Sequence, residues 1–235
     1  MKVGIIGLGK MGYNLALNMR DKGYDVQAYN RSKEKVEAII REGVCGHYTI
    51  EGLLAALDDR KVIWLMVPAG EAVDLVISQL SPYLKTGDIV IDGGNSKYED
   101  TMKRSDFLSE SGVYYLDAGT SGGTEGARNG ACIMVGGEKE AIAYLEDFFK
   151  ALTVKDGFLH TGVSGSGHYV KMIHNGIEYG MMQAIGEGFN ILKSSRFDLD
   201  YCAVAKVWSN GSIIRGLLME LTEQAFINNG DLEQI

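Results

Sequence analysis

A lysine and a glutamate lie seven positions apart in one helical stretch, where together they could do acid–base chemistry. Lys171 and Glu178 belong to the segment GSGHYVKMIHNGIEYGMMQ, with His174 and Asn175 between them. Positions i, i+3, i+4 and i+7 share one face of a helix, and seven positions rise about 10.5 Å, so a base and an acid could act at different carbons of one bound molecule. A solvated face of ordinary ion pairs is the alternative, but it leaves the helix-disfavouring glycines of this stretch unexplained. These glycines are Gly165, Gly167, Gly176 and Gly180.

Three glycines near the N-terminus have the spacing of a dinucleotide-binding fingerprint. Gly7, Gly9 and Gly12 follow a strand-like run in KVGIIGLGKMG and precede a helix expected at residues 11–22. The first glycine permits a tight turn, the second lets the backbone approach a pyrophosphate, and the third allows close packing of the helix on the strand. The N–H groups of the helix N-terminus then face the phosphates. The pattern predicts a bound dinucleotide.

The end of the next expected strand bears on which dinucleotide is bound. An NAD-selective site usually has an acidic residue there for the ribose 2′-hydroxyl, whereas this chain has Asn30, Arg31 and Ser32. The Arg31 guanidinium could pair with a 2′-phosphate or cover the adenine. We therefore expect NADP as the cofactor, with NAD also possible.

Two other motifs compete with this interpretation and are weaker. Residues 4–10 read G-x-x-x-x-G-K, but Met11 stands where a phosphate-binding P-loop needs Ser or Thr for magnesium. Residues 119–123 fit the G-x-S-x-G nucleophile elbow, yet a dinucleotide fingerprint and a Lys/Glu helix leave a hydrolase triad no role. The histidines have no metal-binding spacing, so we expect no metal.

The elements that would position these residues alternate between short apolar runs and amphipathic helices, and from about Gly165 the pattern is helical only. Strands separated by helices imply crossover connections, a parallel sheet and ligands beyond the carboxyl ends of the strands. We predict an α/β fold, with a Rossmann-like doubly wound sheet in residues 1–164 and a partial, all-helical domain in residues 165–235. The strands are expected at residues 3–6, 25–29, 62–67, 89–92, 114–118 and 132–135, and the later helices at residues 168–193, 201–207 and 213–228.

Composition excludes several classes of protein. The chain of 235 residues has a formal net charge of −8, which argues against nucleic acid or an anionic membrane as a partner. No apolar run approaches the roughly 18 residues of a membrane span, and the three cysteines are widely spaced with no C-x-x-C. We expect a cytoplasmic protein without disulfides, in which Cys45, Cys132 and Cys202 are buried.

Five segments resemble those of the 6-phosphogluconate dehydrogenase family, and the chain looks like a short-type, C-terminally truncated member. The resemblance covers the chain from the first strand to about Gln183, and its most specific part is HNGIEY. β-Hydroxyacid dehydrogenases share the Rossmann domain, an SGG loop and a K-x-x-x-N helix, whereas His174, Glu178 and Tyr179 favour the first family. The five segments are residues 165–183, GLGKMG, Asn30-Arg31-Ser32, the loop Val67-Pro68-Ala69-Gly70-x-x-Val73-Asp74, and DGGN followed by GTSGG.

The resemblance implies oxidation and decarboxylation of 6-phosphogluconate to ribulose 5-phosphate and CO2 with reduction of NAD(P)+, as in the pentose phosphate pathway and gluconate utilization. Lys171 would be the general base at the 3-hydroxyl, and Glu178 the acid that protonates carbon 1 after CO2 has left. To act as a base, Lys171 must reach its neutral form, which requires burial or a cationic neighbour.

The resemblance also implies which residues bind the two ligands. The substrate-binding residues would be Asn95, Ser121, Gly122, Gly123, His174, Asn175 and Tyr179. The cofactor-binding residues would be Gly7, Leu8, Gly9, Lys10, Met11, Gly12, Asn30, Arg31, Ser32, Val67, Pro68, Ala69 and Asn95.

Members of this family continue with further helices and with basic residues that grip the substrate phosphate, some of them donated by a second subunit, and this sequence lacks that region. We therefore expect a homodimer or a higher homo-oligomer, acting on a small phosphorylated sugar acid. Two alternatives stay open. One is a β-hydroxyacid dehydrogenase acting on a small 3-hydroxy acid, and the other is a non-catalytic dinucleotide-binding module.

Overall fold

The computed structural model describes residues 1–230, and the chain forms two compact units, Met1–Met172 and Ile173–Ile235. The division that we expect at residue 164 rests on the sequence pattern and stays a prediction. Residues 231–235 of the predicted second domain lie outside the described residues. Among residues 1–230, no helix has both the length and the apolar character needed to cross a bilayer.

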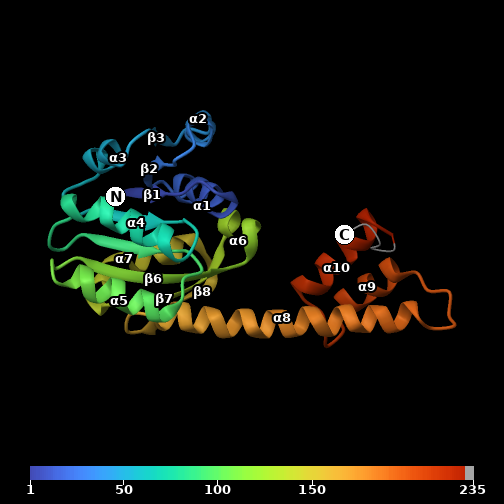
Figure 1. The fold of residues 1–235 in the computed structure, drawn as a ribbon. Helices are drawn as coiled ribbons and strands as arrows, with labels where there is room; N and C mark the ends of the chain where they lie inside the picture. Colours follow the sequence, from blue (N-terminus) through green and yellow to red (C-terminus); the bar gives the residue numbers. More distant parts are fainter. Residues whose placement is uncertain (231–235) are drawn as a thin grey trace. The chain divides into compact units, whose positions relative to one another are not determined.

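The first unit is built around one sheet with the strand order β3-β2-β1-β4-β5-β6-β7-β8 (Figure 1). The order reverses at β1, which pairs in parallel with β2 on one side and with β4 on the other. β5 and β6 continue in parallel beyond β4, so the carboxyl ends of these strands meet at one edge of the sheet. The strands are β1 Lys2–Ile6, β2 Asp25–Tyr29, β3 Cys45–His47, β4 Val62–Leu65, β5 Ile89–Asp92, β6 Tyr114–Ser121, β7 Ala131–Gly136 and β8 Thr153–Gly162.

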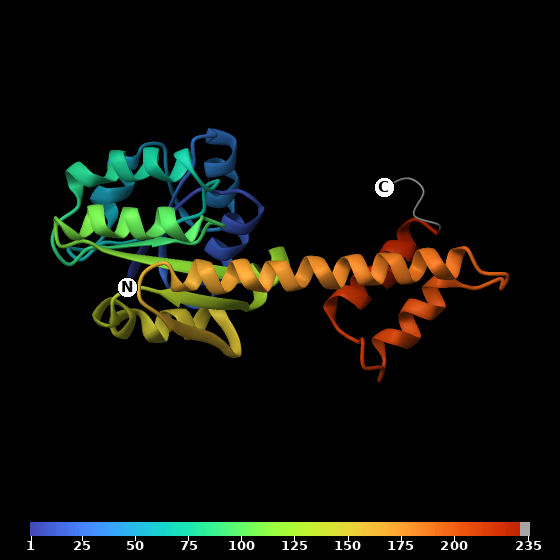
Figure 2. The same cartoon turned by 60° about the horizontal axis from the view of Figure 1, so that its bottom comes forward.

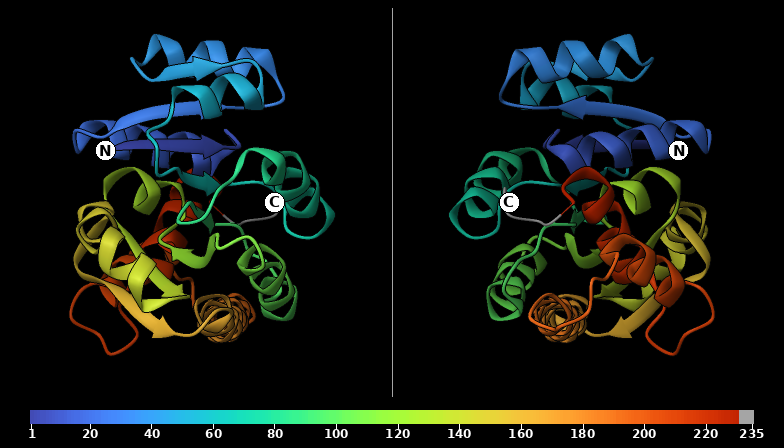
Figure 3. Two further views of the ribbon diagram at one scale, coloured as in Figure 1. Left: turned by 90° about the vertical axis from the view of Figure 1, so that its left-hand side faces the viewer. Right: turned by 90° about the vertical axis from the view of Figure 1, so that its right-hand side faces the viewer.

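Helices cover both faces of this sheet and bury two cores. One core joins Ile5 and Trp64 to α1, α2 and α7, and the other joins Ile6 and Leu65 to α3, α4 and α5. Figure 3 shows α4 and α5 on one side of the sheet and α7 on the other. The first-unit helices are α1 Lys10–Asp21, α2 Lys33–Arg41, α3 Ile50–Ala56, α4 Glu71–Leu80, the 3-10 helix η1 Ser81–Tyr83, α5 Tyr98–Ser109, α6 Gly123–Asn129 and α7 Lys139–Leu152; α8 Ser166–Lys193 begins in this unit.

The sheet differs from our prediction in two strands and in the direction of one pair. β3 has three residues and β8 is an edge strand with register shifts against β7, so neither has the apolar run on which the prediction depends. β7 pairs with β6 antiparallel. Residues 122–130 between them form only the short helix α6, and a parallel crossover needs about a dozen residues or more. The sheet is therefore mostly parallel, and only the parallel direction expected for the strands at residues 114–118 and 132–135 is wrong.

The predicted burial of the cysteines is wrong as well. Cys45 and Cys132 are exposed, Cys202 is half-buried, and all three are free thiols. Cys45 lies on the edge strand β3, and Cys132 pairs with Ser121 at the last residue of β6. Cys45 is thus on an edge strand and Cys132 near the start of the interior strand β7, and neither side chain is enclosed there.

The second unit contains the rest of α8 together with α9 Tyr201–Ser209 and α10 Leu217–Asn228. Its small core is centred on Phe189 of α8, whose ring lies 5.4 Å from that of Trp208 and 5.0 Å from that of Phe226. α10 begins at Leu217 rather than at residue 213, because Gly216, with a φ of 150°, separates it from the preceding turn. The prediction of a helical C-terminal region is confirmed.

Candidate active site

The glycine fingerprint forms the turn between β1 and α1. Gly7 has a φ of 104°, and a Cβ there would lie 2.3 Å from the carbonyl oxygen of Met66. A Cβ on Gly12 would lie 2.0 Å from the carbonyl oxygen of Gly7, so helix and turn are in direct contact. At Gly9, in contrast, no described atom lies within 4 Å of the Cβ position. This open space beside the N-terminus of α1 fits the pyrophosphate of a dinucleotide.

Asn30, just beyond β2, ties the glycine turn in place. Its Oδ1 accepts a hydrogen bond of 2.9 Å from the backbone N–H of Leu8. The Leu8 side chain is buried, so this residue can face a ligand only through its backbone. Arg31 and Ser32 are exposed beyond the same strand end, where an adenosine phosphate could reach them.

Three further loops lie at the same edge of the sheet, because β4, β5 and β6 run parallel to β1. Residues 66–70 follow β4, residues 93–96 follow β5, and residues 122–123 follow β6. Val67 is half-buried, whereas Pro68, Ala69 and Asn95 are exposed. Doubly wound sheets bind their ligands at this edge, at the point where the strand order reverses. The structure therefore brings the expected cofactor and substrate loops of the first unit together.

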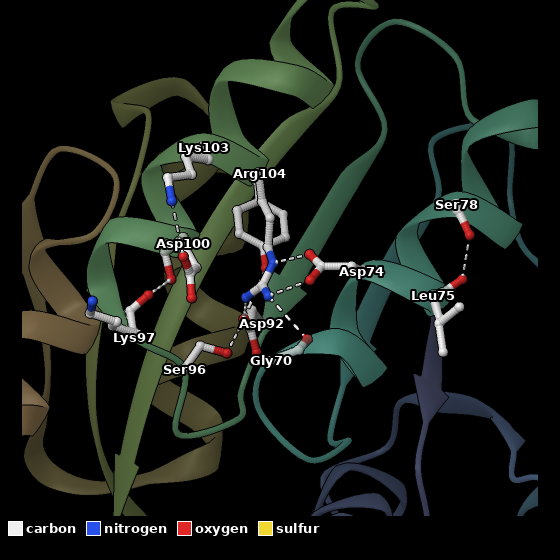
Figure 4. Close-up of polar contacts among 12 residues, drawn as sticks. Gly70, Asp74, Leu75, Ser78, Asp92, Ser96, Lys97, Asp100, Lys103 and Arg104 are labelled. Atoms are coloured by element: carbon white, nitrogen blue, oxygen red, sulfur yellow. Dashed lines mark hydrogen bonds and ion pairs between the residues drawn. The ribbon is translucent and has the colours of Figure 1, made fainter.

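A buried polar network lies under two of these loops (Figure 4). Asp92, the last residue of β5, is fully buried. Its Oδ1 accepts a hydrogen bond from the N–H of Gly94 at 3.0 Å, and its Oδ2 accepts from the hydroxyls of Ser96 at 2.7 Å and Tyr115 at 2.9 Å. The turn that presents Asn95 is thus held from below by one carboxylate.

Arg104 of α5 is the cation of this network, and its side chain is 6% exposed. Its Nε and Nη2 donate to the two carboxylate oxygens of Asp74 at 2.7 and 3.1 Å, and Nη2 also donates to the carbonyl oxygen of Gly70 at 3.1 Å. We did not predict Arg104, because a single arginine within an amphipathic helix carries no motif. The hydrogen bond from Arg104 lowers the pKa of Asp74 below its ordinary value of 3.8.

Acid should weaken the Asp74–Arg104 pair. Because the pKa of Asp74 is lowered in the folded protein, its contribution to stability is present above the ordinary value of 3.8 and is lost as the pH falls through the folded-state value. The Asp74 side chain is 58% exposed, so we expect less than about 1 kcal/mol from the pair. Urea unfolding of wild type and Asp74→Asn between about pH 2 and pH 6 measures this. The difference in unfolding free energy should vanish at the acid end, and a constant difference would contradict the assignment.

Helix α8 begins in close contact with β6 and β7 (Figure 2). A Cβ on Gly167 would lie 2.4 Å from the carbonyl oxygen of Asp117, and a Cβ on Gly136 would lie 2.8 Å from the backbone nitrogen of Gly167. Helix packing therefore explains the glycine at 167. It does not explain Gly176 and Gly180, since no described atom lies within 4 Å of their Cβ positions.

Asp117 of β6 caps the start of α8. Its carboxylate accepts hydrogen bonds from the N–H groups of Gly165 and His168, each at 2.8 Å. Burial raises the pKa of Asp117 above its ordinary value, against the opposing effect of His168 and of these N–H groups. His168 is also fixed from the other side, by a contact of 2.7 Å between its Nδ1 and the hydroxyl of Thr101. We did not predict this cap, since the partner lies in a strand far away in the sequence.

Lys171 follows this cap on α8 and is buried, at 8% exposure. A Cβ on Gly119 of β6 would lie 2.5 Å from the Cβ of Lys171 and 3.2 Å from its Cγ, so the lysine stem lies directly on the strand there. Gly119 comes two residues before Ser121, the last residue of β6, near the end of the sheet that carries the glycine turn. Burial is one of the two conditions for a lysine that acts as a base.

The other expected residues of α8 belong to the second unit. The Nδ1 of His174 lies 3.3 Å from the Oδ1 of Asn175 and 3.7 Å from the Oε2 of Glu178. The Glu178 side chain is 36% exposed, and Tyr179 is exposed. Within the described part of the chain, no group of three or more His, Cys, Asp or Glu side chains is placed to hold a metal ion.

Comparison with known protein families covers both parts of the chain. Residues 2–162 match the NAD binding domain of 6-phosphogluconate dehydrogenase, and residues 167–196 match the C-terminal domain of the same enzyme. The chain belongs to the 6-phosphogluconate dehydrogenase family. The resemblance, the Rossmann-like fold and the nicotinamide-dinucleotide-binding domain that we predicted are thereby confirmed.

Individual relatives agree with this assignment. The chain is 48% identical to the NAD(+)-dependent, decarboxylating 6-phosphogluconate dehydrogenase of Haloferax volcanii, over 98% of this chain and 76% of that protein. It is 44% identical to the NADP(+)-dependent, decarboxylating enzyme of Bacillus subtilis, over 96% of this chain and 50% of that protein. The chain thus spans about three quarters of one relative and half of the other.

Solved structures show the same fold. The Plasmodium falciparum 6-phosphogluconate dehydrogenase, solved in its apo form, with NADP+ and with 6-phosphogluconate, matches with a TM-score of 0.87 and 36% identity, over 95% of this chain and 50% of that one. A 3-hydroxyisobutyrate dehydrogenase of Mycobacterium tuberculosis matches with a TM-score of 0.76 at 22% identity, which shows a shared fold alone.

Proposed function

We propose that this chain catalyses the oxidative decarboxylation of 6-phosphogluconate to ribulose 5-phosphate and CO2 with reduction of NADP+. The observation that supports the proposal most is the buried Lys171, which packs on Gly119 at the end of β6 in the unit that carries the glycine turn. A lysine in this place suits the removal of a proton from a substrate hydroxyl bound over the sheet edge. The HNGIEY segment with Glu178 favours decarboxylation over simple oxidation.

The residues have separate tasks in this reaction. A bound NADP+ supplies the acceptor for the hydride that leaves carbon 3. Lys171 takes the proton of the 3-hydroxyl, which gives a ketone β to the carboxylate. That carbonyl takes up the electrons of the broken bond when CO2 leaves, and the ammonium group of Lys171 stabilises the oxygen of the resulting enol. Glu178 then gives a proton to carbon 1 of the product, while Asn95 and residues 121–123 bind the carboxylate and hydroxyl groups.

Arg31→Ala should selectively weaken NADP+ binding. We expect a loss of about 10-fold, because hydrogen bonds to a charged group contribute about 1.5–3 kcal/mol, while NAD+ has no 2′-phosphate to lose. Calorimetric titration with both dinucleotides measures the difference. Arg41→Ala, which removes an exposed arginine at the other end of α2, is the matched control. An equal loss for both dinucleotides would count against a 2′-phosphate contact.

A spectrophotometric assay with 6-phosphogluconate and each dinucleotide, combined with detection of CO2, tests the proposed function. Reduction with stoichiometric CO2 release supports it. Reduction with a small 3-hydroxy acid and no CO2 would instead identify a β-hydroxyacid dehydrogenase. Dinucleotide binding with no reduction by any substrate would identify a non-catalytic module. A homo-oligomeric state and a cytoplasmic location stay predictions.

A further inference from the structure

The Arg104 network joins two loops that the proposed reaction uses for different ligands. On one side, Arg104 donates to the carbonyl oxygen of Gly70, which ends the loop after β4 and begins α4. On the other side, its Nη1 lies 3.8 Å from the Oδ2 of Asp92, the carboxylate that organises the turn around Asn95. Figure 4 shows the guanidinium between Asp74 and Asp92, with Gly70 below it.

The glycine turn and the loop after β4 suit different halves of a dinucleotide. In a doubly wound sheet the ligand lies across the crevice where the strand order reverses, here between β1 and β4. The glycine turn and Arg31 lie on the β1–β2 side and suit the adenosine half. Residues 67–70 follow β4, next to the turn of Asn95 after β5, and suit the nicotinamide half.

The geometry of an arginine side chain suits a position between these two loops. Its planar fork offers donors in fixed directions, so one side chain can hold the Asp74 carboxylate and a backbone carbonyl at set positions. A lysine would keep the charge but lose the fork. The 6% exposure of Arg104 also keeps water from its 3.8 Å contact with the fully buried Asp92, so the attraction between the two charges is screened less than in a surface ion pair.

We propose that Arg104 is a positioning residue that holds the nicotinamide-side loop, residues 67–70, against the substrate-side turn, residues 92–96. The inference rests on the proposed function, since it takes the dinucleotide to lie across the β1–β4 crevice. It assigns no contact between Arg104 and either ligand. Its consequence is that Arg104 affects the binding of the nicotinamide half and leaves the adenosine half unaffected.

Calorimetric titration with NADP+ and with 2′,5′-ADP, which lacks the nicotinamide half, tests the inference on the full chain. Arg104→Met should weaken NADP+ binding about 10-fold and change 2′,5′-ADP binding less than about twofold. Arg104→Lys should recover part of the loss, about threefold, because it restores the charge without the fork. Lys103→Met, on the exposed side of the same helix with its side chain at 77% exposure, should change neither affinity.

A purely structural role would weaken both ligands together, and that result, or an unchanged NADP+ affinity, would overturn the inference while the proposed function stands. Failure of the wild-type chain to bind NADP+ would overturn both. Should Arg104→Met not fold, as judged by thermal unfolding, Asp74→Asn takes its place. This variant keeps the guanidinium and its hydrogen bond to Gly70, and it removes the negative charge and one of the two acceptor oxygens of Asp74. It must then show the same selective loss for NADP+, about two- to threefold, and an equal loss for 2′,5′-ADP would overturn the inference.

Discussion

Lys171→Met should lower the rate of 6-phosphogluconate oxidation about 10³-fold and leave NADP+ affinity nearly unchanged. General acid–base catalysis by one side chain contributes about 10²–10⁴-fold, and in the proposed reaction Lys171 serves two steps, proton removal and enol stabilisation. Methionine is unbranched like the lysine stem, so the packing of residue 171 on Gly119 is kept. Steady-state rates and a separate NADP+ titration measure the two effects.

A matched lysine on another helix separates catalysis from general damage. Lys150→Met replaces a lysine of α7 whose side chain is 58% exposed and paired with Glu146, and it should leave the rate unchanged. Single-turnover measurements then show whether hydride transfer itself is slowed in Lys171→Met. A variant that keeps more than a tenth of the wild-type rate would remove Lys171 from the proposed mechanism, whatever the dinucleotide affinity.

Much of the fold was predictable because the central strands are buried on both faces. The runs at β4 and β5 are apolar throughout or nearly so, as expected for parallel strands covered by helices on both sides. β8 lacks that signal, since Lys155 and Asp156 interrupt it and none of its residues is buried. The direction of β7 depends on the length of the connection before it, and a pattern of alternating elements does not contain that information.

Within the site, residues of a local motif could be predicted from the sequence, and residues whose partners are distant in the sequence could not. Gly7 and Gly12 were readable from spacing alone, because the fingerprint lies within one segment, although Met66 of the loop after β4 also crowds both positions. Arg104 and Asp117 were not, since their partners belong to other elements that only the folded sheet brings close. Each looks in the sequence like any charged residue on an α/β surface, and only burial and hydrogen bonds distinguish it.

Alanine at Gly12 should destabilise the folded protein strongly, whereas alanine at Gly9 should leave its stability nearly unchanged. A Cβ at Gly12 would lie 2.0 Å from a backbone oxygen, so the turn or the helix must move, and we expect a loss of about 3 kcal/mol or more in unfolding free energy. A Cβ at Gly9 meets no described atom within 4 Å, and the backbone there is extended with a φ of −69°, so stability should change by less than about 0.5 kcal/mol.

The expected defect of Gly9→Ala is in NADP+ binding rather than in stability. The methyl group of Gly9→Ala would occupy the space that the pyrophosphate needs, and overpacking of about 1–3 kcal/mol corresponds to a loss of roughly 5- to 150-fold in NADP+ affinity. Urea unfolding measures the unfolding free energy of both variants, and calorimetry measures their NADP+ affinity. Because Gly9→Ala should leave the free protein stable, weaker NADP+ binding by this variant would be due to a clash of the methyl group with the bound dinucleotide. Wild-type affinity in Gly9→Ala would instead mean that the dinucleotide does not approach the chain at this turn.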